Sequence, residues 1–262
     1  MDCSMATATK IIQVTDLHLM EDASATMLGA RPAETAERVV RAIRESSSPP
    51  DIVIATGDLT HDGEVGSYRR VKSLMDSLPC PVRCALGNHD VRQGFRAGWA
   101  GESAPSDAPL DDAFDFEGLR LILLDSSVPG ESGGHLDPAQ IQWLKKECEP
   151  IASKPKLIFL HHPPVEVGSP WIDLMMLSNA DQFFDAIAPA KGTILGIFFG
   201  HVHQDFEGDW EGIPILGSRP TSVPFTPRTD RCVPSSEPPG YRIIEIREGR
   251  LSSRIVQVPP EG

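Results

Sequence analysis

The stretch Ile11-Ile12-Gln13-Val14-Thr15-Asp16-Leu17-His18 decides the fold, because a short run rich in β-branched residues leads directly into a polar cluster. Such a run, bounded by turn-forming residues, predicts a buried parallel strand. Four further runs repeat the pattern, and each ends in residues that can bind metal ions. The runs and clusters are Ile11–Val14 before Asp16 and His18, Ile52–Ala55 before Gly57-Asp58, Val82–Ala85 before Gly87-Asn88-His89-Asp90, Leu157–Leu160 before His161-His162, and Ile194–Phe199 before Gly200-His201-Val202-His203.

In an open α/β sheet, ligands bind at the carboxyl ends of the strands, so we expect all five clusters at one edge of one sheet. Aspartate, asparagine and histidine suit borderline ions such as Zn²⁺, Mn²⁺ and iron, and the lack of cysteine in the clusters argues against a structural zinc site. One such cluster could be a capped turn with a satisfied histidine. Five clusters at five strand ends predict a two-metal site.

The segments between the runs predict an α/β fold of two packed mixed β-sheets flanked by helices, because strands and helices alternate early and strands return late. We expect a single domain over residues 1–262, with the Pro-, Ser- and Thr-rich segment 219–240 as a long loop on the active-site side. The predicted helices span 31–43, 64–78, 137–147 and 179–187, and the further strands lie within 114–124, 213–216, 241–246 and 251–258.

Composition narrows the function classes. The net charge of −13 disfavours binding of nucleic acid through its phosphates. No apolar run approaches the roughly 20 residues that span a bilayer, and the start of the chain has neither a basic nor an apolar signal region, so we expect no membrane partner and a cytoplasmic location. The five scattered cysteines predict reduced thiols.

The order of the clusters, DxH, GD, GNHD, a histidine that ends a strand and GHxH, resembles the calcineurin-like metallophosphoesterases. Longer segments resemble the bacterial class III cyclic nucleotide phosphodiesterases, in particular the 3′,5′-cyclic AMP phosphodiesterase branch. The likeness covers nearly the whole chain and implies a four-layer α/β/β/α sandwich with phosphodiesterase activity. The segments are Ile11–His18, Ala55–Thr60, Leu123–Gly130, His161–Val165, Trp171–Leu174 and Gly200–Gln204.

The resemblance implies two divalent or trivalent metal ions, Fe, Mn or Zn, and assigns their ligands. Asp58 would bridge both ions. The first ion would also take Asp16, His18 and His203, and the second Asn88, His161 and His201. Ions held about 3.5–4 Å apart can share a hydroxide that attacks phosphorus while they clamp the phosphate oxygens. The implied reaction is hydrolysis of a cyclic nucleotide to a nucleoside monophosphate.

The resemblance also names the catalytic set, Asp58, Asn88 and His89, and the substrate contacts, Asn88, His89 and His203. His89 would touch the phosphate and donate a proton to the leaving oxygen, a task suited to imidazole. It could instead only hydrogen-bond a metal ligand. His162 is expected in a structural or rim role, and His61 either lines the rim or belongs to a solvated loop.

Two arginines leave the class of phosphate ester that the protein would hydrolyse undecided. Arg92 and Arg219 could bind a phosphomonoester dianion bidentately or form surface salt bridges. The alternative functions are therefore a promiscuous phosphodiesterase or phosphomonoesterase and a glycerophosphodiesterase. A non-catalytic interaction scaffold is disfavoured because all seven motif positions are intact. The resemblance adds a homodimer as an expectation, and Trp171, Phe206 and Phe225 are candidates to stack on a base.

Overall fold

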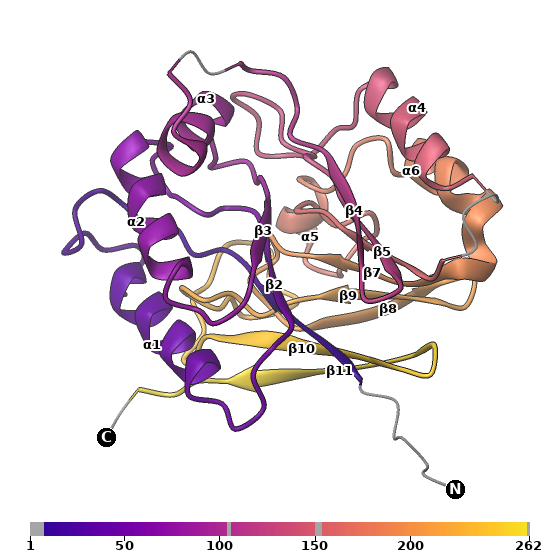
Figure 1. Ribbon diagram of the computed structural model, residues 1–262. Coiled ribbons are helices and arrows are strands. Elements are labelled where there is room, and N and C mark those ends of the chain that lie inside the picture. The colour runs from indigo at the N-terminus through magenta and orange to yellow at the C-terminus, as the bar shows by residue number, and fades with distance from the viewer. Residues whose placement is uncertain (1–7, 104–105, 150–153, 261–262) are drawn as a thin grey trace, which may run out of the picture.

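Two mixed β-sheets form the centre of the protein (Figure 1), in a computed structural model that describes residues 8–103, 106–149 and 154–260. The first sheet has the order β11 (Arg250–Gln257), β10 (Gly240–Arg247), β1 (Thr9–Val14), β2 (Ile52–Thr56) and β3 (Val82–Ala85). The second has the order β4 (Asp112–Phe116), β5 (Leu119–Leu123), β6 (Lys156–Phe159), β7 (Ile194–Phe199), β9 (Ile213–Gly217) and β8 (Phe206–Trp210).

All five apolar runs form strands, but the expectation that they share one sheet is wrong. β1, β2 and β3 lie side by side and parallel in the first sheet, whereas β6 and β7 are parallel neighbours in the second. The strand ends still meet, because the two sheets pack face to face. The side-chain Nε2–H of Gln13 in β1 donates to the Phe199 carbonyl in β7 at 3.0 Å, which joins the sheets. β3 also differs from the buried strand expected: it is an edge strand, and Arg83 is exposed.

Helices cover the outer face of each sheet, as the layers in Figure 1 show. On the first sheet lie α1 (Pro32–Arg44), α2 (Val65–Met75) and the adjoining α3 (Arg92–Phe95) and η1 (Arg96–Ala100). On the second lie α4 (Pro138–Glu147), α5 (Pro170–Asp173), α6 (Ala180–Ile187) and η2 (Ala188–Thr193). Among the described residues, no helix combines the length and the apolar character needed to cross a bilayer.

Three buried cores separate the four layers, and strand alternation produces them. In β1, Ile12 and Val14 face the core under α1 and α2, whereas Ile11 faces the core between the sheets, where it joins Phe159 and Phe198. A third core lies between the second sheet and α4 and α6. This arrangement confirms the predicted α/β/β/α sandwich.

Local sequence signals account for several boundaries. Asp137 caps α4 through a capping box with Gln140, as the Asp-Pro start predicts. The hairpin turns at Glu117-Gly118 and Glu248-Gly249 have positive φ at both residues, a geometry in which glycine has no steric cost. A third turn of this kind at Glu211-Gly212 joins β8 to β9. β8 was not predicted, because Phe206–Trp210 contains two acidic residues and a glycine.

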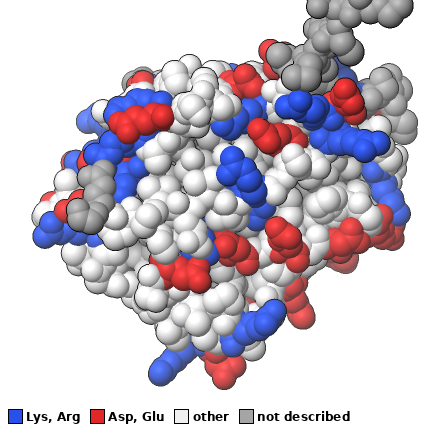
Figure 2. All heavy atoms as spheres, turned by 90° about the horizontal axis from the view of Figure 1, so that it is seen from below, with Lys and Arg blue, Asp and Glu red and all other residues white. Residues whose placement is uncertain are grey.

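One face of the molecule carries charges of both signs. Figure 2 shows acidic side chains interspersed with basic ones on the face seen from below, and the described residues on that face form no continuous basic stripe.

Candidate metal centre

The predicted ligands lie where strands of both sheets end, and most of them have an unusual backbone. Five of the seven adopt positive φ, a region that costs a non-glycine residue of order 1–3 kcal/mol. Such conformations persist where the surrounding structure enforces them, and they turn these side chains inward from the strand ends. The residues are Asp16 (φ 53°), His18 (49°), Asp58 (47°), His201 (67°) and His203 (50°).

One group of four side chains converges at the end of β1. His203 Nε2 lies 3.2 Å from Asp16 Oδ1 and 3.1 Å from His18 Nε2. His18 Nε2 also lies 3.6 Å from Asp58 Oδ2. All four side chains are buried. Two imidazole nitrogens and two carboxylates that face one point provide the donor set of a borderline metal ion.

A second group adjoins the first and shares Asp58. Asp58 Oδ2, the oxygen that faces His18, also lies 3.4 Å from His161 Nε2. Asn88 Oδ1 lies 3.1 Å from His201 Nδ1. His161 Nε2 is fully buried and has no hydrogen-bond partner among the described residues. An orphaned buried nitrogen beside a carboxylate fits a ligand atom, so the residues present suit two ions with Asp58 between them.

Hydrogen bonds at the far ring nitrogens fix two of these histidines in the tautomer that a ligand needs. His161 Nδ1–H donates to the Thr56 carbonyl at 2.8 Å, and His203 Nδ1–H donates to the Val223 carbonyl at 2.6 Å. A carbonyl can only accept, so the proton is on Nδ1 in both rings. Nε2 of each ring is therefore the atom that can face a metal ion, and any second proton that Asp58 or Asp16 holds on that nitrogen leaves when an ion binds.

Burial and neighbouring charges shift the pKa values of the predicted ligands. Burial would raise the pKa of Asp58, but His161 and His18 outweigh it and hold that pKa well below its ordinary value. Burial would lower the pKa of His161, but Asp58 outweighs it and raises the pKa to about 9. Burial lowers the pKa of His18 to about 3. An ionised Asp58 and a neutral His18 are the forms that bind a metal ion.

Asp90 and His162 lie behind the predicted ligands. Asp90 accepts hydrogen bonds from the backbone N–H groups of Leu59, Thr60 and Gly87, so it ties together the loops that carry Asp58 and Asn88. Burial and then Asp58 raise the pKa of Asp90 to about 6. His162 is fully buried and its Nδ1 lies 2.8 Å from Ser126 Oγ. The alternative of a rim position for His162 is wrong, because its fully buried ring lies against the backbone of Gly134 and the rings of His161 and His201.

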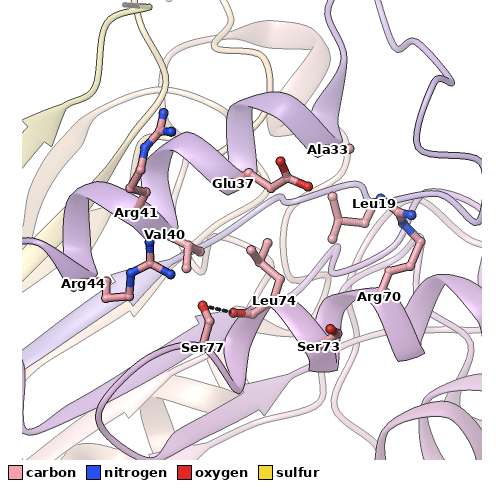
Figure 3. Close-up of a pocket in the computed structure, with 10 residues that line it drawn as sticks. All are labelled: Leu19, Ala33, Glu37, Val40, Arg41, Arg44, Arg70, Ser73, Leu74 and Ser77. Carbon is pink, nitrogen blue, oxygen red and sulfur yellow. Dashed lines mark hydrogen bonds between the residues drawn. The ribbon is translucent and has the colours of Figure 1, made fainter.

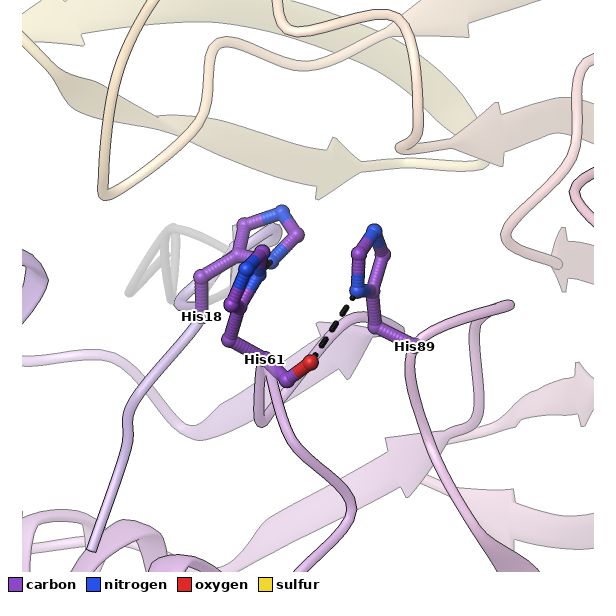
Figure 4. A group of neighbouring side chains, drawn as sticks. All are labelled: His18, His61 and His89. Carbon is purple, nitrogen blue, oxygen red and sulfur yellow. Dashed lines mark hydrogen bonds between the residues drawn. The ribbon is translucent and has the colours of Figure 1, made fainter. Parts of the chain in front are cut away.

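His89 and His61 line the opening of the site together (Figure 4). The backbone N–H of His89 donates to Asp58 Oδ1 at 2.9 Å, and its Nδ1–H donates to the His61 carbonyl at 3.2 Å. The two rings stack with centroids 4.7 Å apart. Burial lowers the pKa of the half-buried His61. The solvated-loop alternative for His61 is wrong, and only its position three residues after Asp58 could have favoured the site.

The two arginines, Arg92 and Arg219, form ion pairs with carboxylates of the protein. Arg92 is buried, its Nε–H donates to Asp125 Oδ2 at 2.8 Å, and Asp125 is fully buried. Arg219 is also buried and pairs with Asp205 at 2.6 Å and Glu237 at 2.7 Å. Neither arginine lines the cleft. Arg92 is therefore paired inside the protein, whereas Arg219 is a buried guanidinium that pairs with carboxylates exposed at the surface. Arg92 also lines a smaller hollow of about 140 Å³ that the predicted ligand Asn88 adjoins.

A cleft of about 460 Å³ opens over the predicted ligands. Part of its lining, called here the apolar wall, is formed by Met27, Leu28, Trp171, Met175 and Phe225. No lysine or arginine occurs among the described residues that line the cleft. The third aromatic candidate is not at the cleft, because the Phe206 ring packs on Phe199 with centroids 5.6 Å apart.

The segment 219–240 contacts the site at several points. Ser222 Oγ–H donates to the Asp16 carbonyl at 2.6 Å, and the Phe225 N–H donates to the His203 carbonyl at 2.8 Å. The Phe225 ring stacks on the His203 imidazole with centroids 4.1 Å apart and planes 5° apart. The segment thus contacts two of the predicted ligands and supplies part of the apolar lining.

A second hollow, of about 470 Å³, lies between α1 and α2 (Figure 3). Arg41, Arg44, Arg70 and Glu37 line it with small polar and apolar residues. None of the seven predicted ligands lines this hollow. Five of the predicted ligands line the cleft at the strand ends instead.

Comparison with known proteins identifies the family. Residues 9–205 match the model of the calcineurin-like phosphoesterases. The chain belongs to this family. All seven predicted ligands, from Asp16 to His203, lie inside the matched region. Members use dinuclear metal sites, and this calcineurin-like phosphoesterase is accordingly a metal-dependent hydrolase of phosphate esters.

Relatives by sequence cover most of this calcineurin-like phosphoesterase. It is 32% identical over 249 residues to the 3′,5′-cyclic adenosine monophosphate phosphodiesterase CpdA of Pseudomonas aeruginosa, with 95% of this chain and 89% of that protein covered. It is 30% identical over 254 residues to a 3′,5′-cyclic-nucleotide phosphodiesterase of Nostoc, with 95% and 92% covered.

Solved structures share the fold at low identity. A dimetal phosphatase from Danio rerio superimposes with a TM-score of 0.68 at 13% identity, over 95% of this chain and 99% of that one. A purple acid phosphatase from yellow lupin gives 0.65 at 12% identity, over 95% of this chain and 52% of that one. These structures show that the two-sheet sandwich is the fold of metallophosphatases.

Proposed function

We propose that this phosphoesterase hydrolyses 3′,5′-cyclic nucleotides, cyclic AMP among them, to nucleoside monophosphates. The observation that carries the proposal is a metal-ligand array beside an apolar wall, in a cleft whose described lining contains no lysine or arginine. The relatives named as cyclic nucleotide phosphodiesterases support the same substrate class.

We assign two ions of Fe, Mn or Zn to the site. Asp16, His18 and His203 would hold the first ion, and Asn88, His161 and His201 the second. Asp58 would bridge them, which is supported by the position of its Oδ2, 3.6 Å from His18 Nε2 and 3.4 Å from His161 Nε2. When bound, such ions activate water and neutralise the charge that develops on the phosphoryl oxygens.

His89 is proposed as the proton donor to the leaving oxygen. Its backbone is held by Asp58 and its Nδ1–H by the His61 carbonyl, so the ring has a defined position at the mouth of the cleft. The other ring nitrogen, Nε2, points away from His61 (Figure 4). That nitrogen could reach a phosphate ester held over the ligands and return a proton to the departing alkoxide.

The lining of the cleft favours a diester over a monoester. A phosphomonoester dianion is usually held by a bidentate arginine, and both candidate arginines are engaged in ion pairs and do not line the cleft. A cyclic nucleotide carries a single negative charge and a flat base. Trp171 and Phe225, with centroids 5.7 Å apart in the apolar wall, offer surfaces on which a base can pack.

The alternatives on the same scaffold are a promiscuous phosphodiesterase or phosphomonoesterase and a glycerophosphodiesterase. A glycerophosphodiester lacks an aromatic base, so it would gain little from the apolar wall. We further propose that residues 1–262 act as one domain in the cytoplasm on a small-molecule substrate. The net charge of −13 disfavours nucleic acid as the substrate.

The test is a substrate panel at matched metal loading. Protein reconstituted with Mn²⁺ is assayed on cyclic AMP, cyclic GMP, a glycerophosphodiester and p-nitrophenyl phosphate. We expect the highest kcat/KM on a cyclic nucleotide, and no turnover in metal-free protein. A higher kcat/KM on the glycerophosphodiester or on the monoester would refute the proposed substrate class while leaving the metal assignment in place.

A further inference from the structure

The predicted ligand histidines differ in the group that lies within hydrogen-bond distance of their Nδ1 atom. His161 and His203 donate Nδ1–H to backbone carbonyls, those of Thr56 and Val223. His18 has a side chain in that place: its Nδ1 lies 3.3 Å from Nδ1 of His61. A backbone carbonyl is present whatever the sequence, whereas an imidazole acceptor exists only because residue 61 is histidine.

The direction of this hydrogen bond follows from the other side of the His18 ring. His18 Nε2 faces His203 Nε2 at 3.1 Å and Asp58 Oδ2 at 3.6 Å, the point at which the first ion is proposed. If Nε2 supplies a lone pair there, a neutral His18 carries its proton on Nδ1. That proton can only be donated to the Nδ1 lone pair of His61.

His61 holds the neighbouring catalytic candidate as well. Its carbonyl accepts the Nδ1–H of His89 at 3.2 Å, and its ring stacks on the His89 ring at 4.7 Å with planes 19° apart. Figure 4 shows the His61 ring beside the His18 ring and the His61 carbonyl joined to the His89 ring by a hydrogen bond. One residue therefore contacts both a proposed ligand of the first ion and the proposed proton donor.

We propose that His61 is a positioning residue of the first metal site, which accepts the Nδ1–H of His18 and so keeps His18 Nε2 directed at the ion. This inference rests on the metal assignment of the proposed function. Partners behind metal-bound histidines typically change metal affinity by about 10–100-fold when they are removed. The second ion, with His161 anchored by a backbone carbonyl, should not depend on His61.

The matched variants are His61→Asn and His61→Leu, which have nearly the same shape. Asparagine places its Oδ1 where the imidazole has Nδ1, so it keeps an acceptor for His18, whereas leucine has none. The backbone carbonyl that holds His89 stays in both. His135→Ala serves as the control, because His135 is exposed, lies outside the cleft and bonds Ser178.

The experiment titrates Mn²⁺ into each metal-free variant by calorimetry, with thermal melting of the metal-free proteins to establish that each is folded. We expect His61→Leu to bind one of the two ions roughly 10–100-fold more weakly and the other normally. His61→Asn and His135→Ala should bind both ions as the natural protein does.

Three results would overturn the inference. The first is that His61→Leu binds both ions with unchanged affinity, and the second is that His61→Asn binds as weakly as His61→Leu. The third is that the natural protein binds a third ion that the His61 variants do not bind, which would make His61 a ligand. A natural protein that binds no pair of ions would instead refute the metal assignment. The failure of the inference and that of the proposed function are thus distinguishable.

Discussion

The proposed proton donor can be tested by replacing His89 with alanine. The substitution removes the imidazole and its contact with the His61 carbonyl, but it keeps the backbone N–H that donates to Asp58 Oδ1 at 2.9 Å. His89 is not among the assigned ligands, so the set of metal-binding groups stays complete. His89→Ala should therefore bind both ions with near-normal affinity.

The size of the loss should depend on the leaving group. The 3′-alkoxide released from cyclic AMP is a poor leaving group and needs a proton, whereas a nitrophenolate leaves without one. General acid catalysis contributes about 10²–10⁴-fold, which corresponds to about 3–5 kcal/mol of transition-state stabilisation. We expect kcat on cyclic AMP to fall by about this factor, and kcat on bis-p-nitrophenyl phosphate to fall less than about tenfold.

The assay measures kcat on both substrates with Mn²⁺-loaded protein, together with the metal content of each sample. His135→Ala, outside the cleft, serves as the control. An equal loss on both substrates with both ions still bound would refute proton donation and leave His89 as a group that stabilises charge on the phosphate. A parallel loss of metal and activity would show that His89 only supports the ligands.

Further predictions concern the metal centre and the framework. Chelation should abolish turnover and lower the melting temperature, since ligand at 100 times its Kd adds about 2.7 kcal/mol of stability; metal-free protein with full diesterase activity would contradict this. Asp58→Ala should lose both ions, whereas His203→Ala should weaken one; metal analysis of Asp58→Ala that finds both ions would refute the bridge. Arg92→Ala should reduce the free energy of unfolding by about 3–5 kcal/mol, because it strands the buried carboxylate of Asp125. Denaturant unfolding measures that loss, and a change below about 1 kcal/mol, the contribution of a typical surface ion pair, would contradict it.

The sequence by itself determined the strands, the residue types at their ends and the family. These features are local: a run such as Ile52–Ala55 indicates a buried strand from its own composition, and Gly57-Asp58 follows it in the chain. The order of the clusters carries the resemblance, and Asp137 before Pro138 marks a helix start in the same way. Neighbours along the chain are sufficient for inferences of this kind.

Only the tertiary structure decided which residues meet. Strand pairing and sheet packing join distant segments, so the division of the five strands between two sheets was hidden from a local pattern. His18 and His61 are 43 residues apart, and their contact arises because β1 and β2 are parallel neighbours. By sequence, Arg92 and Arg219 could bind a phosphate or form salt bridges, and the fold places Arg92 beside buried Asp125 and Arg219 beside Asp205 and Glu237. Side chains choose partners by distance in space, and the fold sets that distance.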